Sequence, residues 1–143
     1  MEIIIITGRI GAGKTLYMSY LAHELAKEKN ANIVANYAIE KGVQYPENSP
    51  IIVAVDEINI FRHFLKDLKD FHEHANRLVK GITYICTTTK LEFIEKDFIP
   101  KNAKIINVEK VEDCITTSEG ELIKISEENI KYDALKMPSD YLL

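Results

Sequence analysis

Eight residues near the amino terminus have the types and spacing of a phosphate-binding loop. The segment GRIGAGKT, Gly8 to Thr15, fills every fixed position of the pattern G-x-x-x-x-G-K-[ST]. Gly11 and Gly13 can take positive φ and let backbone N–H groups approach phosphate oxygens. We expect Lys14 to reach the β- and γ-phosphates of ATP and Thr15 to place its hydroxyl on Mg²⁺. The predicted nucleotide contacts are Gly8, Arg9, Ile10, Gly11, Ala12, Gly13, Lys14, Thr15 and Leu16.

Two carboxylates follow the apolar run in IIVAVDE. An aspartate at the end of a buried strand, here Asp56, suits the Walker-B role of holding Mg²⁺ together with Thr15. Glu57, one position later, is placed to act as the general base on an attacking water. Nucleotide kinases do not need this glutamate, whereas ATP-hydrolysing motors do. The alternative is a strand that simply ends in two solvated acids.

Three threonines, Thr87 to Thr89, end another apolar run. In the additional-strand class of P-loop ATPases, this strand lies between the loop strand and the Walker-B strand. A hydroxyl at its end can bond the γ-phosphate or the water, and we favour Thr88 or Thr89 for this role. The alternative is that threonine is only a good strand residue.

A guanidinium usually stabilises the charge on the transferring phosphoryl group, often from a neighbouring subunit. Arg9, Arg62 and Arg77 are the arginines of this chain. We favour Arg77 as this arginine finger, because it comes just before the fourth predicted strand, near the expected active edge. For each of the three, a solvated surface arginine is the alternative. Basic residues on the helix after Asp56 could follow a DNA backbone, but interleaved acids favour a salt-bridged solvent face.

Strands and helices alternate along the chain, and these elements must position the loop and the carboxylates. Helices are predicted over 14–29, 60–80 and 90–98, and a short one after Ser126. Gly81 is expected to end the second of these helices, and Pro100 follows the third. Strands are predicted over 2–7, 32–38, 51–55, 82–88 and 104–111, and a hairpin over 115–125. This order predicts a single α/β domain, residues 1–143. Its expected fold is a P-loop NTPase of the additional-strand class: a mainly parallel sheet, helices on both faces and a C-terminal hairpin.

Composition narrows the class of protein. The chain has 143 residues and a formal net charge of −4, which argues against a generally basic nucleic-acid coat. Cys86 and Cys114 lack metal-type spacing, so we expect reduced thiols and a cytoplasmic location, in the host cytoplasm if the chain is viral. The chain has no run of about 18 apolar residues, so no membrane span is predicted. The apolar stretch at the amino terminus is too short to be interpreted as a signal peptide.

Taken together, these segments resemble the FtsK/HerA-like P-loop ATPases. Within that group the chain looks most like the zonula occludens toxin-like assembly ATPases of filamentous phages and the small DNA-packaging ATPases of viruses. The segments that carry the resemblance are GRIGAGKTLYMSYLAHEL, VANYAI, IIVAVDEINIF, NRLVKGITYICTTTK and KYDALKMP. The resemblance implies an ATP-driven homo-oligomeric ring, expected to be a hexamer, that moves DNA or assembles a virion.

The chain departs from these families in two respects. Relatives usually end the fourth strand with Thr-Gln, whereas this chain has Thr88-Thr89. Zonula occludens toxin-like proteins also carry a membrane span, and none is predicted in this chain. This difference favours a packaging motor here, or a virion or membrane-anchored partner. Two other functions therefore stay open: a nucleotide-binding scaffold with little turnover, and a small kinase, which Asp56-Glu57 and the lack of an arginine-rich lid disfavour.

Overall fold

The computed structural model describes residues 2–58, 63–94, 96, 99–126 and 132–133. Most predicted elements are confirmed within one or two residues. The elements, in chain order, are β1 (Glu2–Thr7), α1 (Lys14–Lys29), β2 (Asn32–Ala35), β3 (Ala38–Ile39), β4 (Ile51–Val55), α2 (His63–Ala75), β5 (Ile82–Thr88), a 3₁₀ turn (Leu91–Phe93), β6 (Lys104–Val111), β7 (Cys114–Thr117), β8 (Leu122–Lys124) and β9 (Tyr132–Asp133).

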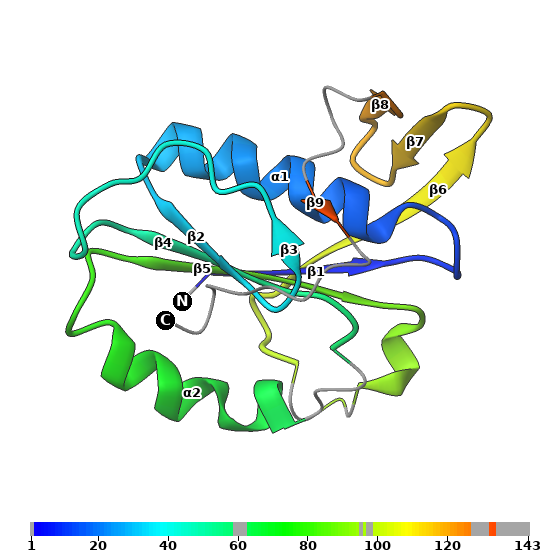
Figure 1. The fold of residues 1–143 in the computed structure, drawn as a ribbon. Coiled ribbons are helices and arrows are strands. Elements are labelled where there is room, and N and C mark those ends of the chain that lie inside the picture. The colour runs from blue at the N-terminus through cyan, green and yellow to red at the C-terminus, as the bar shows by residue number, and fades with distance from the viewer. Residues whose placement is uncertain (1, 59–62, 95, 97–98, 127–131, 134–143) are drawn as a thin grey trace.

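Seven strands form one curled sheet in the order β2-β4-β5-β1-β6-β7-β8 (Figure 1). The first five run parallel to their neighbours, and β7 and β8 continue the sheet as antiparallel strands. The short strands β3 and β9 pair separately. Because β1, β4 and β5 are adjacent and parallel, the segments that follow their carboxyl ends meet at one edge of the sheet.

The predicted fold class, a mainly parallel P-loop NTPase sheet with helices on both faces, is wrong for the described residues. They form a curled, mixed sheet of seven strands with only two α-helices, a single one on each side, α1 and α2 (Figure 1). In this part of the chain neither face carries a layer of several helices. The connections that could carry further covering helices are irregular where they are described. Pro46 and Pro50 interrupt the connection before β4, and the described residues among 90–98 form 3₁₀ turns and not an α-helix.

The helix after β4 is shorter than predicted. The helix expected over 60–80 ends at Ala75 and not at Gly81, because the Arg77 and Leu78 amides bond to carbonyls three residues back. Residues 59–62 lie outside the described part of the chain, as do most of the tail after Ser126 and the helix predicted there. The hairpin is confirmed as β7 and β8.

The sheet separates two apolar cores. Ile85 on β5 belongs to the cluster with α1, whereas Tyr84 and Cys86 belong to the cluster with α2. The alternation follows from strand geometry, in which successive side chains point to opposite faces. It places odd-numbered side chains of β5 on the same side of the sheet as α1.

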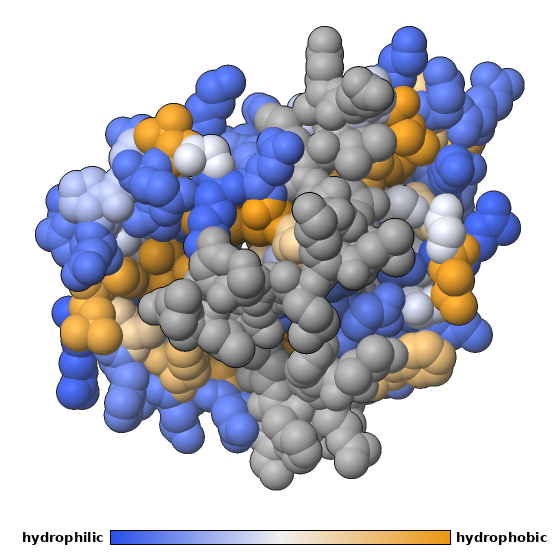
Figure 2. Space-filling view, in the orientation of Figure 1, coloured by the Kyte–Doolittle hydropathy of each residue, from blue (hydrophilic) through white to orange (hydrophobic). Residues whose placement is uncertain are grey.

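Polar and apolar side chains are interspersed on the displayed face of the molecule (Figure 2). Figure 2 shows apolar side chains as separate patches among charged ones on the face that it displays. Ile10, in the predicted phosphate-binding loop, is the most exposed of the large apolar side chains reported for the described residues, at 87%. No helix within the described ranges is long and apolar enough to cross a membrane.

Candidate nucleotide site

The loop between β1 and α1 has the backbone that its glycines predict. Gly11 and Gly13 have φ of 84° and 86°, in the left-handed region that favours glycine. Gly13 is the N-cap of α1, and the Ala12 amide donates to the Arg9 carbonyl at 3.0 Å. The loop therefore turns directly into the amino end of a 16-residue helix, where unpaired N–H groups and the helix dipole favour an anion.

Two of the loop glycines also make room for neighbouring strands. A Cβ on Gly8 would lie 2.8 Å from the carbonyl oxygen of Val108 on β6. A Cβ on Gly13 would lie 2.6 Å from Cδ1 of Ile115 on β7. Apart from its chain neighbours, no atom of the described residues lies within 4 Å of the corresponding point on Gly11. The loop is thus supported from behind by the strands that follow β1 in the sheet, and it is open at Gly11.

Lys14 lies across the loop. Its side chain is buried, and Nζ donates to the Arg9 carbonyl oxygen at 3.0 Å. A buried ammonium needs acceptors around it, and the contact found here is to the loop's own backbone. The positive charge is thereby held at the loop, where the sequence predicted that Lys14 would meet phosphates.

Asp56 joins the start of α1 to the end of β5. Its Oδ2 accepts a hydrogen bond from the Thr15 hydroxyl at 3.0 Å, and its Oδ1 accepts one from the Thr87 hydroxyl at 2.6 Å. Asn36 fixes the backbone of Asp56: Asn36 Oδ1 accepts from the Asp56 amide at 2.7 Å, and Nδ2 donates to the Asp56 carbonyl at 3.0 Å. The predicted pair of Thr15 and Asp56 is therefore brought together.

Glu57 adopts an unusual backbone conformation. Its φ is 56°, one of three positive values at non-glycine residues in the described chain. Its amide donates to the Thr87 hydroxyl at 2.9 Å, and the next amide, that of Ile58, donates to the Thr87 carbonyl at 2.8 Å. Such a conformation costs free energy and persists only where its surroundings impose it, which is common at functional sites. The side chain is partly exposed.

Thr87, which was not among the predicted catalytic residues, is the threonine that bonds to Asp56. Thr88, one of the two favoured, is fully buried, and its hydroxyl donates to the Lys90 carbonyl at 3.1 Å instead. Thr89 lies just beyond the end of β5 and is partly exposed. The missed signal was strand alternation: Thr87 shares the parity of Ile85, on the α1 side, and Thr88 does not.

Asn36 was also missed as part of the site. It follows β2 directly, and β2 pairs with β4 so that Ala35 lies opposite Ala54. A polar residue at the end of the strand beside the Walker-B candidate was the available signal.

The arginines lie in different parts of the molecule. Arg77 is exposed and precedes β5, whose amino end is marked by the bond from the Ile51 amide to the Gly81 carbonyl. The seven residues of β5, about 20 Å of strand, separate it from the loop of its own chain. It is therefore not near the active edge of its own subunit. Arg9 is exposed in the loop, and Arg62 lies outside the described residues.

The side chains present fit Mg²⁺ with a nucleoside triphosphate. Magnesium is usually bound by one or two carboxylates, waters and substrate phosphates, and not by an all-protein cage. The Thr15 hydroxyl and the Asp56 carboxylate, 3.0 Å apart, supply such a donor set at the start of α1. No group of three or more His, Cys, Asp or Glu side chains that could hold a metal occurs within the described ranges, so a closed protein cage is not indicated there.

No protein-family model matches this chain, and no curated protein matches it.

Proposed function

We propose that this chain is a Mg²⁺-dependent ATPase. The observation that carries the proposal is the hydrogen-bonded chain from Thr15 through Asp56 to Thr87, at the helix end of a loop with two positive-φ glycines. It joins a site suited to phosphate and a site suited to magnesium in one place. Neither a solvated pair of acids nor a chance sequence match would require these contacts.

Each group has a role that follows from its position. The N–H groups at the start of α1 and the Lys14 ammonium bind the triphosphate anion. Thr15 and Asp56 hold Mg²⁺, which when bound neutralises charge on the phosphate oxygens. Thr87 orients Asp56 and also accepts the Glu57 amide, so one hydroxyl sets the positions of both carboxylate residues.

Glu57 is the proposed general base. Its partly exposed carboxylate accepts a proton from water, and the Thr87 contact to its amide fixes the backbone from which it projects. The positive φ of Glu57 is compatible with this role, because backbone conformations of this kind cluster at functional sites.

The biological task that we propose is that of a motor for DNA packaging, translocation or virion assembly. The proposal of a homo-oligomeric ring, with DNA as the substrate to be moved, rests on the sequence resemblance described above. In such a ring an arginine from one subunit meets the loop of the next, which is the only arrangement in which Arg77 acts as the finger. Cys86 and Cys114 are free thiols, as is usual in the cytoplasm, where we place this activity.

The test is the rate of phosphate release from Mg-ATP with and without DNA, measured beside the mass of the assembly. We expect Lys14→Ala to abolish ATP binding, and Glu57→Gln to bind ATP but lower hydrolysis by about 100-fold. Thr88→Val is the matched control, since its hydroxyl bonds to Lys90 on the other side of β5. Equal, negligible hydrolysis of ATP by the assembled protein with and without DNA would overturn the proposal that the protein is a motor.

A nucleotide-binding scaffold is the second candidate. Two observations favour it: the residue after β5 is Thr89 where relatives have glutamine, and the buried Thr88 hydroxyl is already committed to the Lys90 carbonyl. A scaffold would change its assembly mass on binding ATP and release no phosphate. The same measurement therefore separates the two candidates.

A further inference from the structure

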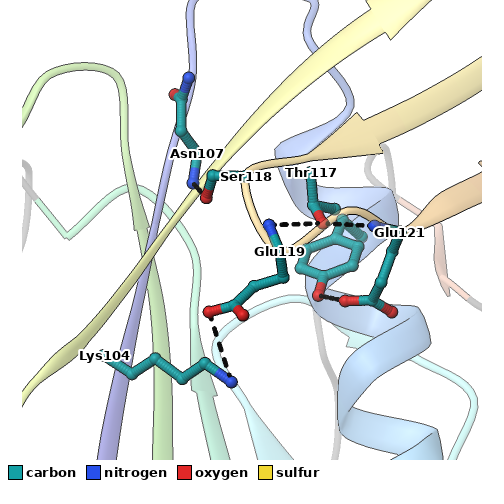
Figure 3. Close-up of polar contacts among 7 residues, drawn as sticks. Lys104, Asn107, Thr117, Ser118, Glu119 and Glu121 are labelled. Atoms are coloured by element: carbon teal, nitrogen blue, oxygen red, sulfur yellow. Dashed lines mark hydrogen bonds and ion pairs between the residues drawn. The ribbon is translucent and has the colours of Figure 1, made fainter.

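The turn between β7 and β8 is a preformed structure. The Thr117 hydroxyl accepts the amides of Glu119 and Glu121 at 3.3 and 3.2 Å (Figure 3). The Thr117 amide donates to the Glu121 carbonyl at 3.1 Å, and Gly120, with φ of 83°, donates to the Thr117 carbonyl at 3.0 Å. With its backbone groups paired in this way, the turn can hold a side chain in a fixed place.

One side of this turn is attached to β6 next to the start of the loop. Ser118 and Asn107 exchange two hydrogen bonds, at 3.0 Å through the Ser118 hydroxyl and at 2.9 Å through the Asn107 carbonyl. The Asn107 side chain accepts a hydrogen bond from the Thr7 hydroxyl at 3.2 Å. Thr7 is the last residue of β1 and directly precedes Gly8. The turn is thus connected to the residue from which the loop begins.

The other side of the turn is attached to the helix in which the loop ends. The hydroxyl of Tyr17, a fully buried residue in the first turn of α1, donates to Glu121 Oε1 at 2.6 Å. Burial of Tyr17, and then its hydrogen bond to Glu121, raise the pKa of this tyrosine far above its usual value, so the hydroxyl stays a donor. Ile115 of β7 packs on Gly13, at the N-cap of α1.

We propose that Tyr17 and Glu121 are positioning residues that pre-shape the loop Gly8–Thr15. The hairpin bonds directly to Tyr17 at one end of the loop, and it reaches Thr7 at the other end through Asn107 of β6. The distance between β1 and the first turn of α1 is thereby set before any phosphate binds. A loop with its ends fixed loses less conformational entropy on binding an anion. The inference rests on the proposed function only for the identity of the anion that binds the loop, which is taken to be a nucleotide.

The hairpin also supplies a matched control. Glu119, two residues from Glu121 in the same turn, pairs with Lys104 Nζ at 3.5 Å (Figure 3). Its charge also raises the pKa of Tyr17, so Glu119→Gln controls for a loss of negative charge near Tyr17 without the loss of the hydrogen bond. Glu121→Gln keeps a side-chain oxygen that can accept from Tyr17, whereas Glu121→Ala does not. Tyr17→Phe keeps the buried ring and removes only the donor.

The experiment measures two quantities for each variant: amide hydrogen exchange of residues 17–19 without nucleotide, and the Kd and kcat for Mg-ATP. We expect Glu121→Ala and Tyr17→Phe each to raise the exchange rate and the Kd by about fivefold, with kcat within twofold. The double variant should show no further change, because both single substitutions remove the same hydrogen bond between Tyr17 and Glu121. Glu121→Gln and Glu119→Gln should stay within twofold of the wild type.

Unchanged exchange in Glu121→Ala, or an equal effect in Glu119→Gln, would overturn the proposal. Equal loss of thermal stability in all variants without a change in exchange would also overturn it, since that is a purely structural role. If the wild type binds no ATP, the proposed function fails, while the exchange rates still decide whether the turn positions α1.

Discussion

Thr87 and Thr88 are adjacent in sequence and have the same side chain, yet they serve opposite sides of the sheet. Both are fully buried. The Thr87 hydroxyl donates to Asp56 and accepts from the Glu57 amide, whereas the Thr88 hydroxyl donates to a nearby backbone carbonyl. A change of one position along the strand therefore decides whether a hydroxyl belongs to the candidate site.

Thr87→Val tests this difference, because valine keeps the shape of threonine and removes the hydroxyl. We expect the free energy of unfolding to fall by about 1–3 kcal/mol, since a buried amide and a carboxylate oxygen lose their partner. Hydrolysis should fall by about 10- to 100-fold, because both carboxylate residues lose their orientation. Phosphate release and urea unfolding check the two effects.

Thr88→Val is the internal comparison for this prediction. It removes one buried hydroxyl of the same kind, so a similar loss of stability is expected, but hydrolysis should remain within about twofold. Equal hydrolysis by the two variants would show that the Thr87 contacts do not orient Asp56 and Glu57.

At the level of residues, the sequence predicted those members of the site that a motif names. The loop forms locally, since a short strand and a short turn leave the chain few alternatives. Asp56 reaches Thr15 because β1, β5 and β4 are neighbouring parallel strands. Thr87 was passed over because residue type and strand end were considered without the alternation that separates it from Thr88. Asn36 was missed because its contact with Asp56 depends on which strand pairs with β4, a long-range fact.

At the level of elements, the hairpin and the loop are packed against each other through Gly13. This glycine has a positive φ, and a Cβ on it would meet the Ile115 side chain. Gly11 has the same sign of φ and open space around it. A comparison of substitutions at the two glycines therefore separates the effect of backbone strain from the effect of contact with β7.

Gly11→Ala and Gly13→Ala should both lower the free energy of unfolding by about 1–2 kcal/mol, because each forces a Cβ into the left-handed region. Gly13→Ala should cost about 1–3 kcal/mol more, since it overpacks the contact with Ile115. Ile115→Ala alone should cost about 2–5 kcal/mol, because Ile115 is fully buried, but in the Gly13→Ala background it should cost less by about the overpacking part. Urea unfolding of the single and double variants gives the coupling, and simple additivity would contradict the contact.

The elements themselves were largely predictable, and their assembly was not. Buried strands such as Ile51–Val55 and Ile82–Thr88 match the expected ranges because each is an apolar run between clear breaks. The fold class was wrong because alternating strands and helices were assumed throughout, while a 3₁₀ turn replaces the helix expected over 90–98 where the structure describes it. Docking of the hairpin on α1 was unforeseen, because contacts such as Tyr17 to Glu121 span 104 residues.

At the level of the whole molecule, the two cores on either side of the sheet hold titratable groups in their neutral forms. Burial raises the pKa of the Cys86 thiol to about 12 and that of the Tyr84 hydroxyl to about 12. Both residues lie in the core that includes Leu68 of α2. Tyr17, in the α1 core, shifts in the same direction. Unfolding releases all three to ordinary solvent exposure.

These shifts set the sign of the alkaline response. A group whose pKa is higher in the folded state keeps its proton when the unfolded chain has already lost it. Its contribution to stability is complete below the unfolded pKa, about 9 for cysteine and about 10 for tyrosine, and is lost as the pH rises toward the folded value. The free energy of unfolding should therefore fall steadily between pH 9 and pH 12.

Cys86→Ala isolates one of these contributions. Each such group steepens the decline by about 1.4 kcal/mol per pH unit between its unfolded and folded pKa. The variant should be less stable than the wild type at pH 7, because it leaves a small cavity, but its decline above pH 9 should be shallower by about that amount. Urea unfolding at intervals from pH 7 to pH 11 measures both. Parallel curves for the two proteins would show that the thiol ionises as readily in the folded core as in the unfolded chain. The sheet would then not seal this core from water.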